Sequence, residues 1–116
     1  KNIVLAHRMR QYIGQHFQNP LTLEEIGAVF GISPYHAAHI FKEVVGVSPI
    51  QYMIRCRIGE AQNLLIASDY SATQIAAMVG YASVQHFNAI FTKIVGLPPI
   101  RYRKRYLENM QGKRTQ

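Results

Sequence analysis

The sequence is poor in cysteine and in acidic residues, and it contains no long hydrophobic run. Its only cysteine, Cys56, has no second thiol with which to form an internal disulfide, which suits a reducing cytoplasm. No apolar stretch approaches the roughly 18 residues that a membrane-spanning helix needs. The N-terminus lacks the charged, apolar and small-residue segments of a secretory signal. These absences argue against a disulfide-stapled, membrane-spanning or secreted protein and favour a cytoplasmic one.

The scarcity of acid leaves the chain strongly basic. Six Asp and Glu stand against 13 Lys and Arg, so the formal net charge is +7. Such a balance favours an anionic partner, either nucleic acid or an anionic membrane surface, and composition does not choose between them. A basic surface that serves solubility alone is a third interpretation. Apolar residues make up 48% of the 116 positions, which is enough for one globular domain or for two very small ones that share a core.

Capping signals divide the chain into helices. Ser33-Pro34 and Ser48-Pro49 each place a hydroxyl cap before a proline, whose fixed φ suits the first turn of a helix. No stretch shows the sustained alternation of a strand, so we predict an all-α fold. Capping-box spacings begin at Thr22 and Ser71, and glycines suited to left-handed C-terminal caps stand at positions 31, 46, 80 and 96. The predicted helices are about seven, at residues 2–17, 22–30, 34–45, 49–67, 72–79, 84–95 and 99–109.

One pattern occurs twice in the chain. Ile26, Ala28 and Gly31 recur 49 positions later, and a longer set that begins at Ser33 and ends at Tyr52 recurs 50 positions later. The shift arises at Ala82, which is one extra residue in the second turn. Two copies are too few for a solenoid, which needs three or more repeats, so they indicate a paired module. We predict a first unit at 1–48, a linker helix at 49–67, a second unit at 68–109 and a frayed tail at 110–116.

Each copy is a short helix, a tight turn and a longer helix, which is the layout of a helix-turn-helix. The longer helices carry an apolar stripe that should face the core. Their neighbouring faces hold small or hydrogen-bonding residues without a carboxylate, and this absence fits a surface that contacts phosphate-bearing nucleic acid. The predicted inward stripes are Ala37, Ile40, Phe41 and Val44, and Phe87, Ile90, Phe91 and Ile94; the outward ones are Tyr35, Ala38, His39 and Lys42, and Gln85, Asn88, Ala89 and Thr92.

Two ordered motifs resemble a known family. The first is FKEVVGVSPIQYMIRCRIGEAQNLL at 41–65, and the second is I-A-x-x-x-G-Y followed by F-x-x-x-F-x-K-x-x-G-x-x-P-x-x-Y-R within 75–103. Both are similar to the DNA-binding domain of AraC/XylS-type transcription regulators, and the resemblance covers almost the whole chain. It implies two helix-turn-helix subdomains joined by a long linker helix, with a recognition helix of each in successive major grooves of double-stranded DNA.

The resemblance also implies roles for individual residues. Many relatives carry Arg where His39 and Ala89 stand, and Lys or Arg where Thr92 stands, so we hypothesise that the second unit prefers A·T-rich steps. Arg57 matches a linker-helix arginine, for which we favour a structural role over a phosphate contact or a pair with Glu60. The implied base readers are Tyr35, Ala38, His39, Val84, Gln85, Asn88 and Ala89. The predicted phosphate contacts are Lys42, Thr92, Lys93 and Arg103, with Arg101, Lys104 and Arg105 as further candidates.

Other chemistry finds little support in the sequence. His36 and His39 have the spacing of two metal ligands, but no cysteine or carboxylate that would complete a zinc site is evident nearby. Cys56 lacks an activating His–acid set and is expected to be a small packed residue. We therefore expect no catalytic site, no metal and no cofactor.

The expected function is a sequence-specific transcription regulator, by family resemblance an activator that contacts RNA polymerase subunits. The alternative is a protein-interaction module that contacts RNA polymerase and has weak DNA affinity. Family members commonly carry a separate effector-binding or dimerisation domain, and none fits in this chain. Because the chain begins at Lys1 and not at Met, we expect it to be the C-terminal piece of a longer protein.

Overall fold

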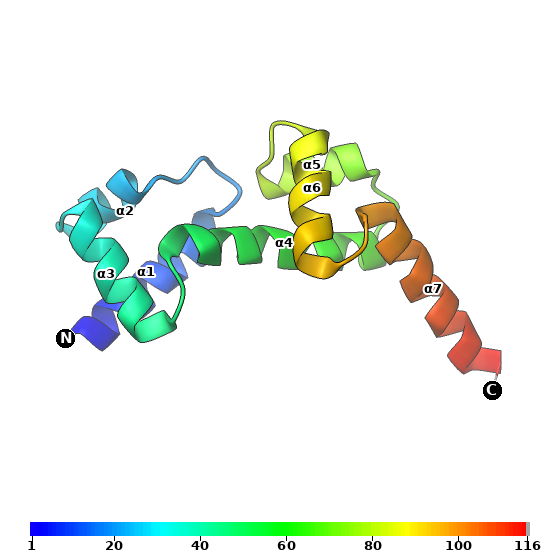
Figure 1. Cartoon of the computed structure of the whole chain (residues 1–116), viewed down its shortest axis with the longest axis horizontal. Coiled ribbons are helices and arrows are strands. Elements are labelled where there is room, and N and C mark those ends of the chain that lie inside the picture. Colours follow the sequence, from blue (N-terminus) through cyan, green and yellow to red (C-terminus); the bar gives the residue numbers. More distant parts are fainter. Residues whose placement is uncertain (116) are drawn as a thin grey trace. The chain divides into compact units, whose positions relative to one another are not determined.

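The structure is a computed structural model that describes the backbone of residues 1–115 and the side chains of residues 1–112. The described residues form seven α-helices and no strand, which confirms the all-α prediction (Figure 1). Only the last helix differs much from its predicted range, because it continues past residue 109; position 116 of the predicted tail lies outside the described residues. The helices are α1 (Asn2–His16), α2 (Leu23–Phe30), α3 (Pro34–Val45), α4 (Pro49–Ala67), α5 (Ala72–Val79), α6 (Val84–Val95) and α7 (Pro99–Thr115).

The chain divides into two units whose boundary lies inside α4. The first unit is Lys1–Arg57 and the second runs from Ile58 onward. The first unit therefore contains α1, α2, α3 and the first half of α4, and the second contains the other half of α4 with α5, α6 and α7. Each unit has the same order of elements, which is a first helix, a helix-turn-helix and a closing helix. The predicted domain bounds, with α4 as a separate linker, stay a prediction.

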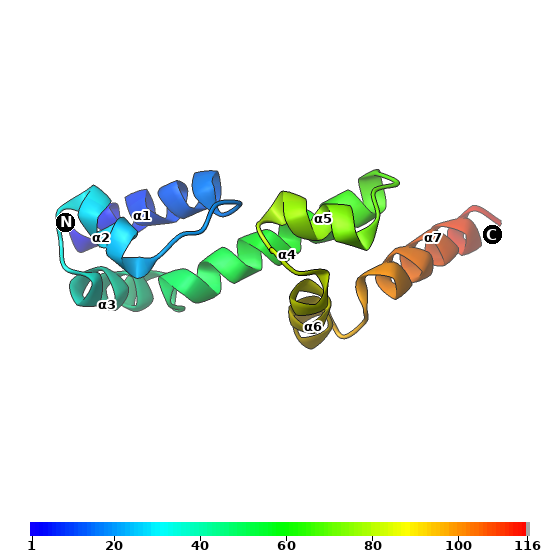
Figure 2. The same cartoon turned by 90° about the horizontal axis from the view of Figure 1, so that it is seen from above.

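In the first unit, α3 packs against both α1 and α2 (Figure 2). Phe41 at the centre of α3 is fully buried, and its ring meets the edge of Tyr52 with centroids 5.7 Å apart. Burial of such aliphatic and aromatic side chains contributes about 1.5–3 kcal/mol each. The fully buried positions on α1 have helical spacing, and the core includes Ala6, Met9, Ile13, Ile26, Ala37, Ile40, Phe41 and Met53.

The second unit repeats this plan with one exception. Phe91 of α6 is fully buried and meets Tyr102 at 5.6 Å, as Phe41 meets Tyr52. Ile94 was predicted to face the core, but the structure leaves it 49% exposed. The reason is that α6 packs mainly against α5 and α7, so the outer side of its last turn stays open. The buried residues of this unit include Ile58, Ala61, Leu65, Ile75, Ala76, Val79, Phe87 and Phe91.

The predicted caps form hydrogen bonds at the helix starts. The Ser71 hydroxyl accepts from the Gln74 amide at 3.1 Å, and the Gln74 side chain accepts from the Ser71 amide at 2.9 Å. Ser48 and Gln51 make the same reciprocal pair at the start of α4. The side chains of Thr22, Ser33 and Ser83 each accept from an amide three residues on, and the four predicted glycines all have positive φ.

The extra residue in the second turn has a steric explanation. In the first unit the Ile32 carbonyl crosses directly over Gly27, where an added Cβ would lie 2.6 Å from that oxygen. The matching position in the second unit is Ala76, which has a Cβ and is fully enclosed. Ala82 lengthens the second turn by one residue. The short turn therefore requires glycine beneath it, whereas the longer turn tolerates alanine.

We predict that Gly27→Ala destabilises the first unit by about 1–3 kcal/mol, because the backbone of the turn must move to admit the methyl group. Urea unfolding monitored by circular dichroism measures the change. The matched control is Gly14→Ala in α1, where an added Cβ meets nothing within 4 Å and alanine favours the helix. A Gly27→Ala variant as stable as the Gly14→Ala variant contradicts this account of the turn.

Candidate nucleic-acid interface

The exposed face of α3 holds the residues predicted to read bases in the first unit. Ala37, Ile40 and Phe41 are buried, and their burial fixes the opposite face of α3 toward solvent. Tyr35 is 80% exposed, so nearly its whole ring is available for contact. The four predicted residues on this face lie together, with Ala38 half-buried and Tyr35, His39 and Lys42 exposed.

His39 has two neighbours on this face. Its ring stacks against Tyr35 with centroids 6.2 Å apart and planes 12° from parallel. Its Nε2 atom also lies 3.6 Å from a carboxylate oxygen of Glu43, one helical turn further on. The sequence prediction of an acid-free surface is therefore wrong for α3, because Glu43 at i+4 reaches the predicted stripe from its edge. The i, i+4 spacing is the signal that was available in the sequence.

The exposed face of α6 holds the corresponding residues of the second unit. Gln85 and Ala89 are exposed, while Val84, Asn88 and Thr92 are half-buried. The Ser83 hydroxyl donates to Gln85 Oε1 at 3.0 Å, so the cap of α6 also orients the Gln85 amide. The S-x-Q spacing is the sequence signal for this role of Ser83.

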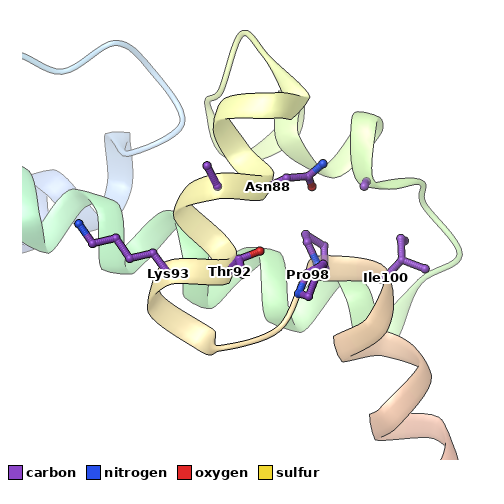
Figure 3. A pocket seen from close by; sticks show the side chains of 8 residues that line it. Asn88, Thr92, Lys93, Pro98 and Ile100 are labelled. Atoms are coloured by element: carbon purple, nitrogen blue, oxygen red, sulfur yellow. The ribbon is translucent and has the colours of Figure 1, made fainter.

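An open hollow of about 700 Å³ lies beside α6. Figure 3 shows Asn88 and Thr92 on α6 facing Pro98 and Ile100, which belong to the start of α7 and the residue before it. Lys93 lies at its margin but extends away from Pro98 and Ile100 (Figure 3). The hollow thus brings predicted base-reading and phosphate-contacting residues of α6 beside Pro98, Pro99 and Ile100, which no motif in the sequence marks as part of a site.

The predicted phosphate contacts divide into two groups. Lys42 and Lys93 are exposed near the ends of α3 and α6, where their ammonium groups are free to reach an anion, and Thr92 lines the hollow. The further cations Arg101, Lys104 and Arg105 are exposed along α7, together with Glu108.

Arg103 has a different environment. Its Nε donates to the Leu65 carbonyl at 2.7 Å, and its Nη2 donates to the carbonyls of Ser68 at 3.1 Å and Tyr70 at 2.7 Å. These carbonyls belong to the end of α4 and to the segment that enters α5. Arg103 therefore has an intramolecular role, because its Nε and Nη2 donate to backbone oxygens, and its phosphate contact stays a prediction.

Arg57 makes the equivalent contacts in the first unit. Its Nε donates to the Phe17 carbonyl at 2.7 Å and its Nη2 to the Asn19 carbonyl at 3.0 Å, and the residue is 7% exposed. Phe17 and Asn19 follow α1 and lead toward α2. The structural role favoured from the sequence is confirmed, because the buried guanidinium of Arg57 donates to these two carbonyls. In each unit, one arginine of the closing helix fixes the segment that enters the helix-turn-helix.

Neither Cys56 nor the described acidic, histidine and cysteine side chains form a reactive or metal-binding arrangement. Cys56 is half-buried, and burial raises the pKa of its thiol, which makes it a weaker nucleophile at neutral pH. Within residues whose side chains are described, no three His, Cys, Asp or Glu side chains gather as a metal site would require. In the same part of the chain, no helix is both long and apolar enough to cross a bilayer.

Comparisons with known proteins place these features in a family. A family model described as a helix-turn-helix domain matches residues 26–105. The chain is 32% identical over 104 residues to the MmsAB operon regulatory protein of Pseudomonas aeruginosa, covering 90% of this chain and 34% of that protein. The chain spans less than half the length of the curated relatives that it matches.

Solved structures share the fold. The C-terminal domain of AraT, a response regulator from Geobacillus stearothermophilus, matches with a TM-score of 0.84 and 33% identity, covering 86% of this chain and 84% of that one. The DNA-binding domain of AdpA in complex with a target DNA matches with a TM-score of 0.85 and 26% identity, covering 90% of this chain and 94% of that one.

We predict that Arg103→Gln lowers the free energy of unfolding by about 1–3 kcal/mol, because the carbonyls it serves lose a charged donor. Chemical denaturation provides the measurement. Arg103→Lys should recover little of the loss, since a single ammonium group cannot reproduce the forked geometry. Lys104→Gln, at an exposed neighbour, is the control and should change stability by less than about 0.5 kcal/mol. Equal stability of the Arg103→Gln and Lys104→Gln variants argues against the intramolecular role.

Proposed function

The chain belongs to the AraC-type family of helix-turn-helix DNA-binding domains of transcription regulators, and from that premise we propose that it reads a specific DNA sequence with α3 and α6. The observation that carries the proposal is the repeated design of these two helices. In each, buried aromatic and aliphatic side chains turn a face of small and hydrogen-bonding residues outward. Such a face approaches base edges in a major groove without steric obstruction.

The proposed base contacts follow from the chemistry of each side chain. Gln85 and Asn88 each present an amide that pairs bidentately with adenine N6 and N7. Tyr35 and Val84 offer apolar surface to thymine methyl groups, while the small Ala38 and Ala89 allow close approach. His39 completes the reading face of α3. Because neither Ala89 nor Thr92 supplies a cation for guanine, we propose that the second unit prefers A·T-rich steps.

The proposed phosphate contacts are Lys42, Thr92 and Lys93. The two lysines supply charge and Thr92 supplies a neutral donor. Each phosphate that a lysine neutralises releases counterions, so affinity should fall as salt rises. Arg103 is a further candidate only through its remaining amino group, since its Nε and Nη2 hold the carbonyls that lead into α5.

We propose that the two units occupy successive major grooves. Equivalent grooves on one face of a duplex recur about every 34–36 Å. The single helix α4 is common to both units, and its 19 residues give a length of about 28 Å at 1.5 Å per residue. A length of this order suits two readers about one helical turn apart. One chain then reads an asymmetric site without a dimer.

The regulatory part of the proposal is activation through contact with RNA polymerase subunits. Curated relatives are longer than this chain, which supports a further effector-binding or dimerisation domain in the whole protein. The second candidate function is a protein-interaction module with weak DNA affinity. Glu43 favours it, because a carboxylate on the reading face of α3 opposes phosphate.

We predict that Gln85→Ala weakens binding to a preferred site by about 5- to 150-fold, which corresponds to the loss of one bidentate base contact worth about 1–3 kcal/mol. Sites selected from random DNA, followed by fluorescence anisotropy, give the affinities. Gln15→Ala on the exposed side of α1 is the control and should leave affinity unchanged. If Gln85→Ala weakens binding to random DNA by the same factor, Gln85 does not read a base.

We also predict that hydroxyl-radical footprinting of the selected site shows protection of two tracts about one helical turn apart. Insertion of five base pairs between the tracts places the second on the opposite face of the duplex, so affinity should fall to that of one unit. Protection of a single turn, or tolerance of the insertion, contradicts two-groove reading. Failure to select any preferred site, combined with retention of an RNA polymerase subunit in a pulldown, favours the interaction module.

A further inference from the structure

The hollow beside α6 has an apolar wall that hydrogen-bonding base readers do not explain. Its lining carries no acidic residue, and only Asn88, Thr92 and Lys93 are polar. Ile100 on its wall is 49% exposed, which leaves a large aliphatic surface in contact with water. The remaining lining residues are Ala72, Ala89, Pro98 and Pro99.

Two residues of this wall, Pro98 and Pro99, supply no backbone hydrogen-bond donor. A helix N-terminus ordinarily attracts phosphate through its free backbone N–H groups. Here the helix starts at Pro99 and is preceded by Pro98, and neither residue has a backbone N–H. A phosphate against these residues would lose water without gaining a donor from either proline, whereas an apolar group would gain from leaving water.

The opposite side of the hollow belongs to α6 and carries the proposed base reader Asn88 beside the proposed phosphate contact Thr92. Asn88 and Thr92 point toward Pro98 and Ile100 across the opening (Figure 3). A base edge that meets the Asn88 amide therefore lies beside the apolar wall. Of the groups that base pairs present in the major groove, the 5-methyl group of thymine is the apolar one.

We propose that this hollow receives the 5-methyl group of a thymine in the DNA site, with Ile100 and Pro98 as specificity-determining residues. The inference rests on the proposed function, since it requires α6 to lie in a major groove. It adds the start of α7 to the reading surface. An A·T pair satisfies both sides of the hollow, because Asn88 bonds the adenine while the partner thymine presents its methyl group.

The test uses the selected site and removes one methyl group at a time. Each thymine under the second unit is replaced by deoxyuridine, which has the same hydrogen-bonding edge without the methyl group. We expect deoxyuridine at one of these positions to weaken binding by about three- to fivefold, which is the effect of losing one buried methyl group. The other positions should change affinity by less than a factor of two.

Two protein variants assign the effect to the hollow. In the Ile100→Ala variant, the same deoxyuridine substitution should weaken binding by less than a factor of two, because the thymine methyl group has already lost its protein partner. Ile94→Ala is the matched control, since Ile94 is also 49% exposed but is not among the lining residues. In this variant, deoxyuridine should still weaken binding by about three- to fivefold. Both variants alter exposed side chains, so folding should be preserved.

The possible results separate this inference from the proposed function. A site that is bound specifically but tolerates deoxyuridine at every position overturns the inference and leaves the proposed function intact. The inference is also overturned if deoxyuridine weakens binding of the Ile100→Ala variant as much as it weakens binding of the unaltered protein. If Ile100→Ala instead weakens binding to all DNA and reduces its salt dependence, the hollow holds the sugar-phosphate backbone and the inference is wrong. Failure to select any preferred site overturns both.

Discussion

The burial of one phenylalanine in the second helix of each helix-turn-helix is the interaction on which the rest depends. Phe41 and Phe91 are fully enclosed, and each meets the edge of a tyrosine from the following helix. Because a helix has a fixed periodicity, seating this one side chain determines which residues of α3 and α6 point outward. The core therefore determines which side chains of α3 and α6 are exposed. Any contact with DNA depends on this rotation of each helix about its own axis.

Local signals in the sequence were enough to predict most of the fold. Seven helix ranges, the caps at Ser33 and Ser71 and the positive-φ glycines depend on neighbours only a few residues apart, so the chain encodes them directly. The family followed from motifs that span nearly the whole chain. Ile94 was misjudged because its exposure depends on which helices pack against α6, and periodicity alone does not contain that information.

The candidate site was less predictable than the fold. Which residues face outward on α3 and α6 was clear from the apolar stripes, but their surroundings were not. The partners of Arg103 lie 33 to 38 residues away in sequence, so its contacts with carbonyls left no local signal. The hollow arises where α6 meets the start of α7, and Pro98 and Ile100 gain significance only from that contact. The arginines that serve the two units also differ in register, because Arg57 is eight residues after Pro49 and Arg103 is four after Pro99.

The sharing of α4 between the units limits how this protein can be recombined. Met53 belongs to the core of the first unit, whereas Ile58, Ala61 and Leu65 are buried in the second. A crossover between Arg57 and Ile58 therefore leaves each core with side chains of one ancestry. Exchange of α2–α3 alone would mix two ancestries in one core, because α3 packs against α1 as well as α2. Chimaeras that exchange target preference should accordingly be joined inside α4, at a point where both parents continue the same helix.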